Sequence, residues 1–521
     1  MALVAMARSD MIRRFAELRA RLEHSPADSD AAFDLAEVAS LLRCEEEALP
    51  LVTMAAETVG TSPALWQWKA LLHRALDQNI AAISAFDRAS RLSPADAKIA
   101  HGRARTALEA GLPAMALFDH AHRLAPNDGD ILLGRASAQL AEGDLPAAIA
   151  GIDNLLVRNP GWMAGHELVS HLRWLSGDHN SFAISLDRAL AIASADPALW
   201  HMLIVLLIHA GQHDRARDVI HRGRSLAGPQ LFFDVNEAIV ASEQGDIMTA
   251  DRLFASLEAV DDMTVAVRHI RHLLRTRRIE QAAALAESRT GDPDSHLIWP
   301  YLGTAWRLLG DPRWDWLEGD PRLVGTIDLT GMSSSLDRLA ACLQDLHIAP
   351  SQQLDQSVRG GTQTEGALFA RIDPELCILR AAIVDAVAQH IAQLPPYDPA
   401  HPTLGQPRPH VIRFNGSWSV RLNAQGHHAH HIHPDGWLSS AFYVALPSEA
   451  QRGPAPAGWL ALGKPQTELG LDLAATRMIE PQPGRLVLFP STMWHGTLPF
   501  EGGERLTVAF DVAAGVREED R

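Results

Sequence analysis

Apolar residues recur along the first 310 positions with the three-and-four spacing of amphipathic helices, in a segment rich in alanine and leucine. Glycines punctuate this pattern at steps of 32, 34, 34 and 34 residues, at Gly111, Gly143, Gly177, Gly211 and Gly245. Each is expected to end one helix with a left-handed cap shortly before the next begins. The same phase continues weakly to Asp77, Arg278 and Gly310. Prolines on nearly the same period are predicted in the first turn of the following helix, at Pro63, Pro94, Pro126 and Pro160.

A 34-residue period of paired helices resembles the tetratricopeptide repeat. The resemblance implies about seven or eight helical pairs over residues 30–310, stacked as a solenoid with a concave groove. We therefore predict a helical repeat array over residues 1–310 whose groove holds a protein or peptide partner. The alternative is an array that only braces the rest of the chain or forms a homodimer.

Residues 311–400 form a predicted junction, in which the repeat fails. Helical patterns cover residues 331–347 and 373–394, and a polar segment, SQQLDQSVRGGTQTEGALF, lies between them. Its Gly360–Gly361 pair predicts a turn or a close backbone approach. We expect this segment to form a loop over a pocket, with Gln356 and Arg359 as substrate contacts. Six prolines in residues 395–410 predict an extended connection.

Beyond the junction, over residues 401–521, the pattern changes to alternation with period two. It predicts strands over residues 410–414, 418–422, 438–446, 458–462, 485–489 and 505–512. Because helical patterns do not separate these strands, we predict an antiparallel sandwich or barrel.

Composition, net charge and cysteine spacing argue against several classes of function and of binding site. The net charge of −17 disfavours a general affinity for nucleic acid. Cys44, Cys342 and Cys377 lie far apart without a CxxC motif, which argues against a disulfide framework or a zinc–thiolate site. The sequence shows neither a secretory signal nor an apolar run of membrane-spanning length, so we predict a cytoplasmic protein with no membrane partner.

Histidines concentrate in the stretch GHHAHHIHPDGWLSSAFYV. In an extended chain, residues i and i+2 share a face, so His431 with His433, or His433 with Asp435, would form half of a metal site. The candidate for the remaining ligand is His495, on a later strand. The residues alone leave the two pairings open. The other histidines of the stretch are expected to lie at the surface or to orient the ligands, namely His427, His428 and His430.

Three motifs, HxHPxGWLSSAFYVALP, PGRLVLFPSTMWHGTLPF and ERLTVAFDV, resemble the 2-oxoglutarate/Fe(II) oxygenases that bacteria carry fused to tetratricopeptide repeats. DQSVRGGTQT and GSWSVRL extend the resemblance over residues 340–515. It implies a double-stranded β-helix, also called a jelly roll and similar to cupins, with flanking helices. It further implies Fe(II) bound by His431, His433 and His495, and 2-oxoglutarate paired through its C5 carboxylate with Arg505.

These residue types suit the implied chemistry. Three protein ligands on one face of iron leave positions for a 2-oxo acid and for O2. The guanidinium of Arg505 suits a carboxylate, and a short hairpin would place it one strand from His495. Thr507, Tyr443 and Arg421 are further candidates for cosubstrate contacts. Trp437 is a candidate for the wall of the substrate pocket.

We predict a 2-oxoglutarate- and Fe(II)-dependent oxygenase that hydroxylates a protein or peptide recruited by the repeats, with ascorbate added in vitro. One alternative is a cupin-type metal dioxygenase that binds its metal through three histidines and uses no 2-oxo acid. Another is a non-enzymatic repeat scaffold with a vestigial oxygenase fold. The Walker loop, the GxSxG elbow and the dinucleotide fingerprint do not occur in the sequence.

Overall fold

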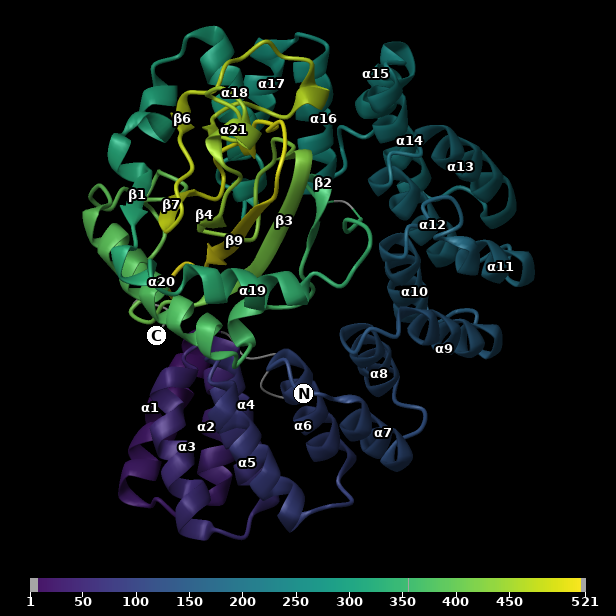
Figure 1. Cartoon of the computed structure of the whole chain (residues 1–521). Coiled ribbons are helices and arrows are strands. Elements are labelled where there is room, and N and C mark those ends of the chain that lie inside the picture. The colour runs from purple at the N-terminus through teal and green to yellow at the C-terminus, as the bar shows by residue number, and fades with distance from the viewer. Residues whose placement is uncertain (1–7, 355, 517–521) are drawn as a thin grey trace.

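The computed structural model describes residues 8–354 and 356–516. An N-terminal helical array, drawn purple to teal in Figure 1, curves around a C-terminal β-domain drawn in green and yellow. The array consists of α1 (Arg8–His24), α2 (Ser29–Leu42), α3 (Glu45–Val59), α4 (Pro63–Ala75), α5 (Asn79–Leu92), α6 (Ala97–Glu109), α7 (Met115–Leu124), α8 (Gly129–Ala141), α9 (Leu145–Arg158), α10 (Met163–Leu175), α11 (Ile184–Ile192), α12 (Pro197–His209), α13 (His213–Ala227), α14 (Leu231–Gln244), α15 (Ile247–Ser256), α16 (Met263–Arg275), α17 (Ile279–Glu287) and α18 (Trp299–Leu309).

Within the described residues, α2 to α17 form eight consecutive pairs, as the 34-residue period predicts. Positive backbone φ angles of 68 to 89° end the first helix of five pairs, at Gly111, Gly143, Gly177, Gly211 and Gly245. The phase also continues at Asp77, with φ 54°, and at Gly310, with φ 66°. Further downstream, the residue with a positive φ angle is Arg277, with φ 62°, one residue before the predicted Arg278.

The predicted role of the prolines is wrong at three of the four positions. Pro63 begins α4, as expected. Pro94, Pro126 and Pro160 each lie two residues beyond the end of a helix. The residue before a proline avoids the helical conformation, so these prolines mark helix ends rather than starts. Side-chain caps begin two of the next helices, from Asp96 and Asp128.

After the array come the 3-10 helix η4 (Pro321–Leu323) and two longer helices, α19 (Leu336–Leu346) and α20 (Pro374–Gln393), close to the predicted ranges. The strands are β1 (Gly325–Asp328), β2 (Val358–Gln363), β3 (Phe414–His428), β4 (Leu438–Ala445), β5 (Leu460–Leu462), β6 (Arg477–Ile479), β7 (Arg485–Pro490), β8 (His495–Thr497) and β9 (Arg505–Val512). A short helix, α21 (Glu449–Arg452), follows β4.

The strands form two antiparallel sheets, so the prediction of an antiparallel β-domain is confirmed. One sheet has six strands in the order β1-β7-β4-β9-β3-β2, and the other has three in the order β6-β5-β8. The described residues do not close into a barrel, so the sandwich is the correct alternative of the two predicted. Sequence reasoning missed the short strands β1, β2, β6 and β8, and it split β3, whose first predicted part at 410–413 is not strand.

Residues of β9 alternate between two environments, as its pleat requires. Leu506, Val508, Phe510 and Val512 pack with α19 and α20 in the largest core cluster. The intervening residues Arg505, Thr507 and Ala509 line a pocket between the two sheets. The helices therefore cover one face of the six-stranded sheet and leave the other face to the candidate site.

The array touches the β-domain at both of its ends. Near the N-terminus, Arg413 forms ion pairs with Glu45 and Glu46 of α3. At the far end, the indole nitrogen of Trp494 donates to the carbonyl of Pro300 and to Thr304, both on α18, at 3.0 Å. Figure 1 shows the resulting curve of helices around the sheets.

A segment of the junction crosses from the β-domain to the middle of the array. We call Ile348–Leu354 the crossing segment. Ala349 packs in a core cluster of α8, α9 and α10, and Leu354 packs against the cluster that contains α12. Ser351 lies 2.9 Å from the imidazole Nε2 of His179. The crossing segment therefore packs against the middle of the array.

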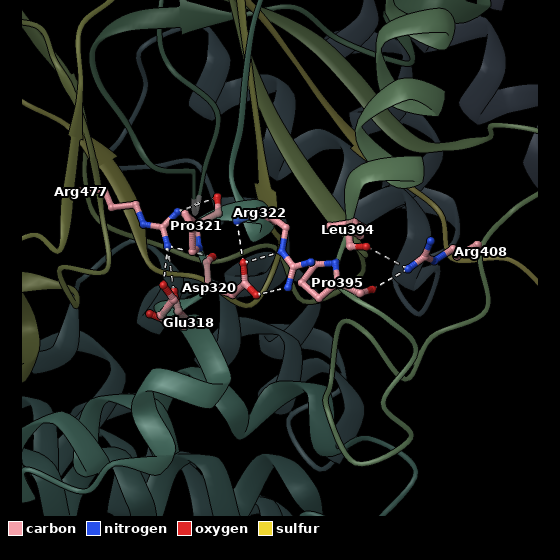
Figure 2. A network of polar contacts seen from close by, with 9 residues as sticks. Glu318, Asp320, Pro321, Arg322, Leu394, Pro395, Arg408 and Arg477 are labelled. Atoms are coloured by element: carbon pink, nitrogen blue, oxygen red, sulfur yellow. Dashed lines mark hydrogen bonds and ion pairs between the residues drawn. The ribbon is translucent and has the colours of Figure 1, made fainter.

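Arginines fasten the junction to the β-domain through backbone carbonyls. Figure 2 shows Arg477 of β6 donating to the carbonyls of Glu318, Asp320 and Pro321 at 3.0 to 3.4 Å. In the same view Arg408 donates to the carbonyl of Pro395 at 2.6 Å. These bonds anchor the irregular segments on either side of α19 and α20.

The described helices include none that is both long and apolar enough to cross a membrane. The three cysteines are unpaired.

Candidate functional site

Three histidines meet between the two sheets. His431 and His433 follow the end of β3, and His495 begins β8. His431 and His495 form an antiparallel bridge, with backbone N–H···O distances of 2.9 and 3.0 Å in the two directions. Their ring centroids lie 4.1 Å apart, and the His433 ring lies 4.8 Å from that of His495. One nitrogen from each ring lies within 4.8 Å of the other two, a spacing that can hold a metal ion.

Hydrogen bonds set the same orientation in all three rings. Nδ1 of His431 lies 2.8 Å from the carbonyl of Ala429, and Nδ1 of His495 lies 3.0 Å from the carbonyl of Met493. Nδ1 of His433 lies 2.7 Å from the carboxylate of Asp511. Since these acceptors carry no proton, each Nδ1 is the donor and each neutral ring presents the lone pair of Nε2.

Two of these lone pairs lie close together, and their contact becomes favourable when a cation lies between them. Nε2 of His431 lies 2.9 Å from Nε2 of His433. With the protons held on Nδ1, two neutral rings cannot form a hydrogen bond across this gap. A metal ion or an added proton is needed to make the contact favourable, so the donor set fits a bound divalent metal.

Burial favours the neutral form that a ligand requires. Burial, and after it the neighbouring histidines, lowers the pKa of His431 well below the ordinary value. Burial likewise lowers the pKa of His495 well below that value. Burial and then Arg505 lower the pKa of His428, which lines the same pocket, to about 3. Metal binding would therefore displace few protons from His431 and His495 near neutral pH.

A buried guanidinium lies in the same pocket as the three imidazoles. Arg505 is 2% exposed, and its hydrogen bond in the structure runs from Nη1 to the carbonyl of Gly458 at 2.9 Å. Its Nε has no partner. Among the described residues, the side chain that interacts electrostatically with this guanidinium is Tyr443 and not a carboxylate. A buried cation with unused donors fits the carboxylate of a bound acid.

Tyr443 and Thr507 lie beside Arg505. The Tyr443 ring centroid is 5.0 Å from the guanidinium carbon, and its buried hydroxyl has no partner. Thr507 lines the pocket, and its hydroxyl makes a long 3.5 Å contact to the carbonyl of Val420. The structure thus places Thr507 in the pocket lining and Tyr443 opposite it on the neighbouring strand β4. Arg505, however, lies on the six-stranded sheet facing His495, and not on the strand beside it as the hairpin argument predicts.

Four other candidates lie away from the trio. Arg421 pairs with Glu504, at 2.6 Å through Nε, and lies opposite Leu506 on the helix-covered face. Asp435 is exposed in a turn, where its carbonyl accepts from Asn415. Trp437 is 6% exposed and donates to the carbonyl of Thr403 at 2.9 Å, in the helix-covered core. Arg359 is exposed and donates to the carbonyl of Gln356 at 2.6 Å, whereas Gln356 does line the pocket.

Two further residues contribute to the site, and sequence reasoning missed the second of them. Trp418 lines the pocket with its ring 5.4 Å from that of His433. Asp511 receives the Nδ1–H of that histidine. The alternation of β9 offered a signal for Asp511, because it continues the pocket-facing series of Arg505, Thr507 and Ala509. Its distance from His433 in the sequence hid the contact.

The predicted close approach at the glycine pair is present. Gly360 has φ 70°, and a Cβ on Gly361 would lie 2.2 Å from the carbonyl oxygen of Arg421. The glycines therefore let β2 run against β3 beside the pocket.

Residues 416–511 match the family model described as "Putative 2OG-Fe(II) oxygenase". The match spans the strands and loops that carry the three histidines, Arg505 and Asp511. The chain is thus an array of tetratricopeptide-like helical pairs followed by a domain of this oxygenase family. A search of curated proteins finds no significant match.

Two solved structures are similar to portions of the chain. A tetratricopeptide repeat protein from Parabacteroides merdae shares 15% identity, over 49% of this chain and 88% of its own, with a TM-score of 0.30. A prolyl-4-hydroxylase from Pseudomonas putida shares 19% identity, over 37% of this chain and 94% of its own, with a TM-score of 0.26. Scores of this size support no argument about function.

Proposed function

We propose that the protein is a 2-oxoglutarate- and Fe(II)-dependent oxygenase that hydroxylates a protein or peptide substrate. The observation that carries the proposal is one pocket with three convergent Nε2 atoms and, facing them, a buried Arg505 without a counter-anion. His431, His433 and His495 would hold the iron, which would supply O2 activation coupled to decarboxylation of the 2-oxo acid. One oxygen atom of O2 enters succinate, and the other enters the hydroxylated product.

The chain's own residues would bind and orient the cosubstrate. Arg505 would pair with the distal carboxylate, and the unpartnered hydroxyl of Tyr443 could donate a further hydrogen bond to it. Trp418 and Phe489 form apolar walls of the pocket. Because these walls exclude water, they strengthen the ion pair between Arg505 and the bound carboxylate.

The array supports the choice of a protein or peptide substrate. A groove crosses the first helices of three successive pairs, α12, α14 and α16. Apolar side chains line most of it, including Val205, Phe232 and Val235, with polar groups at Asn236 and Arg268. Such a lining suits an extended chain with apolar side chains. The crossing segment then leads to Gln356 and Ser357, which line the pocket.

The test is succinate formation by the purified full chain with Fe(II), ascorbate and 2-oxoglutarate. Slow turnover without a substrate is expected, and His495→Ala should abolish it together with metal binding. If His495→Ala turns over at the parent rate, the proposal is wrong. Val235→Glu separates recruitment from chemistry: it should keep the slow turnover and lose the stimulation by a peptide substrate.

The three-histidine donor set also favours a second candidate, a cupin-type dioxygenase that uses no 2-oxo acid. The two differ in their need for Arg505. For the cupin-type enzyme, Arg505→Ala would leave oxygen consumption with the true substrate intact. For the 2-oxoglutarate enzyme, the same change removes the anchor of the cosubstrate.

A further inference from the structure

A carboxylate lies directly behind one of the three histidines. Oδ1 of Asp511 accepts the Nδ1–H of His433 at 2.7 Å, on the side of the ring away from His431. The Asp511 side chain is 12% exposed and that of His433 is 16% exposed, so solvent screens their interaction only partly.

This partner sets His433 apart from the other two rings. His431 and His495 both donate to neutral backbone carbonyls. Among the described residues, Asp511 is the only carboxylate hydrogen-bonded to any of the three. The hydrogen-bonded carboxylate therefore contacts the trio through His433 alone.

The fold holds Asp511 in this position from several sides. Ser439, opposite Asp511 in the β4–β9 pair, donates to Oδ1 at 2.6 Å. Ser439 also lies 2.9 Å from the hydroxyl of Ser491, and both serines are fully buried. A Cβ on Gly436 would lie 3.1 Å from Cβ of Asp511 and 2.4 Å from Oγ of Ser491. A side chain at position 436 would therefore displace Ser491 and Asp511 from this arrangement.

A divalent metal bound by three neutral imidazoles lacks the anion that a two-histidine, one-carboxylate site contributes. We propose that Asp511 is the positioning residue that supplies this charge through His433. The carboxylate fixes the ring with Nε2 toward the metal, and its hydrogen bond makes that nitrogen a stronger donor. Because Asp511 itself stays off the metal, it occupies none of the positions needed by cosubstrate and O2. The inference rests on the metal centre of the proposed function and does not depend on turnover.

The test measures metal affinity without 2-oxoglutarate. Co(II), which resists air oxidation better than Fe(II), is titrated into the full chain and followed by calorimetry and visible absorption. Asp511→Asn keeps an oxygen for the His433 N–H and removes the charge. It should weaken Co(II) binding about 10- to 100-fold and shift the absorption bands of the bound ion. Asp511→Ala should weaken binding at least as much.

Asp435→Asn is the matched control, because it removes one negative charge two residues from His433, at an exposed turn. Its Co(II) affinity should stay within about twofold of the parent. Thermal unfolding of each variant shows that the fold is kept, and Asp511→Asn carries the test if Asp511→Ala does not fold.

Parent-like affinity and absorption bands in folded Asp511→Asn overturn the inference while leaving the metal centre in place. An equal loss in Asp435→Asn also overturns it, since the effect would then be one of general charge. If the parent binds no Co(II), or His495→Ala binds it equally well, both the inference and the metal centre of the proposed function fail.

Discussion

The helical array and the β-domain both bury apolar cores, but they join residues at different separations along the chain. In the array, the Phe86 ring packs against Gly102 and the Phe118 ring against Gly134, in each case between neighbouring helices. In the β-domain, His433 meets Asp511 across 78 residues. The array is thus a series of local contacts, whereas the site depends on strands brought together from far apart.

This difference predicts how far the effect of a mutation should spread in each region. A disturbed repeat interface affects its neighbours, because stability in such arrays is close to a sum over adjacent units. A disturbed strand in the β-domain can affect the whole site, since β8 carries His495 while β9 carries Arg505 and Asp511. The following predictions test this contrast, starting with the largest effect.

Replacing Arg505 with Ala should weaken 2-oxoglutarate binding about 30-fold or more. The loss of a buried, hydrogen-bonded charge partner costs roughly 2–5 kcal/mol. Calorimetric titration of 2-oxoglutarate into the Co(II)-loaded chain measures the effect. Arg421→Ala is the control, because Arg421 pairs with Glu504 on the opposite face of the same sheet. Equal losses in the two variants would contradict the assignment of the pocket face.

Replacing Arg413 with Ala should loosen the first helices of the array from the β-domain. It leaves Glu45, which is 5% exposed, without its cation. Removing one partner of a buried ion pair costs about 3 kcal/mol. Hydrogen exchange should rise in α2 and α3 and remain low in the β-domain core. Arg105→Ala, which breaks an exposed pair with Glu109, should cost less than about 0.5 kcal/mol.

Acid should destabilise the β-domain partly through His390, which is 3% exposed at the end of α20. Burial lowers its pKa from 6.5 to about 4, so the unfolded chain binds the proton more readily. Stability is therefore intact above pH 6.5 and is lost as the pH falls toward 4, by about 2–3 kcal/mol. Urea unfolding at pH 7.5 and 4.5 measures this difference. It should shrink in His390→Leu, and an unchanged difference would contradict the role of His390.

Replacing Gly134 with Ala should destabilise the array locally, because the new Cβ would lie 2.3 Å from the Phe118 ring. Overpacking of this kind costs about 1–3 kcal/mol. Hydrogen exchange should rise in α7 to α9 and stay unchanged around the histidines. Gly151→Ala in α9 is the matched control, with its nearest contact at 3.9 Å, and should be neutral or slightly stabilising. Exchange that spreads into the β-domain would contradict the local character of the array.

Much of the array was predictable from the sequence, and the reason is its locality. The spacing of glycines such as Gly111 and Gly143 reports helix ends directly, because the left-handed conformation they need is a property of single residues. The prolines misled at Pro94, where a helix end was interpreted as a helix start. The glycines and the prolines both lie, along the sequence, next to the helix ends that they mark.

In the β-domain, the sequence determined the identity of the candidate ligands but not their surroundings. Histidine spacing and the family motifs indicated His431, His433 and His495, which the structure brings together. The strand pattern could not show that Arg421 faces away from the pocket or that Asp435 lies exposed in a turn. The face of a sheet on which a side chain lies depends on strand register and sheet order. Pairings between strands far apart in the sequence set both of these.

The residue types, the repeat period and the candidate chemistry are therefore properties of the sequence itself. Only the tertiary structure placed Asp511 behind His433, Arg505 on the sheet facing His495, and the crossing segment against the array. Each of these contacts joins residues far apart in the chain, so no local pattern could encode it. These contacts form because the strands and helices have only a few ways to bury their apolar faces together.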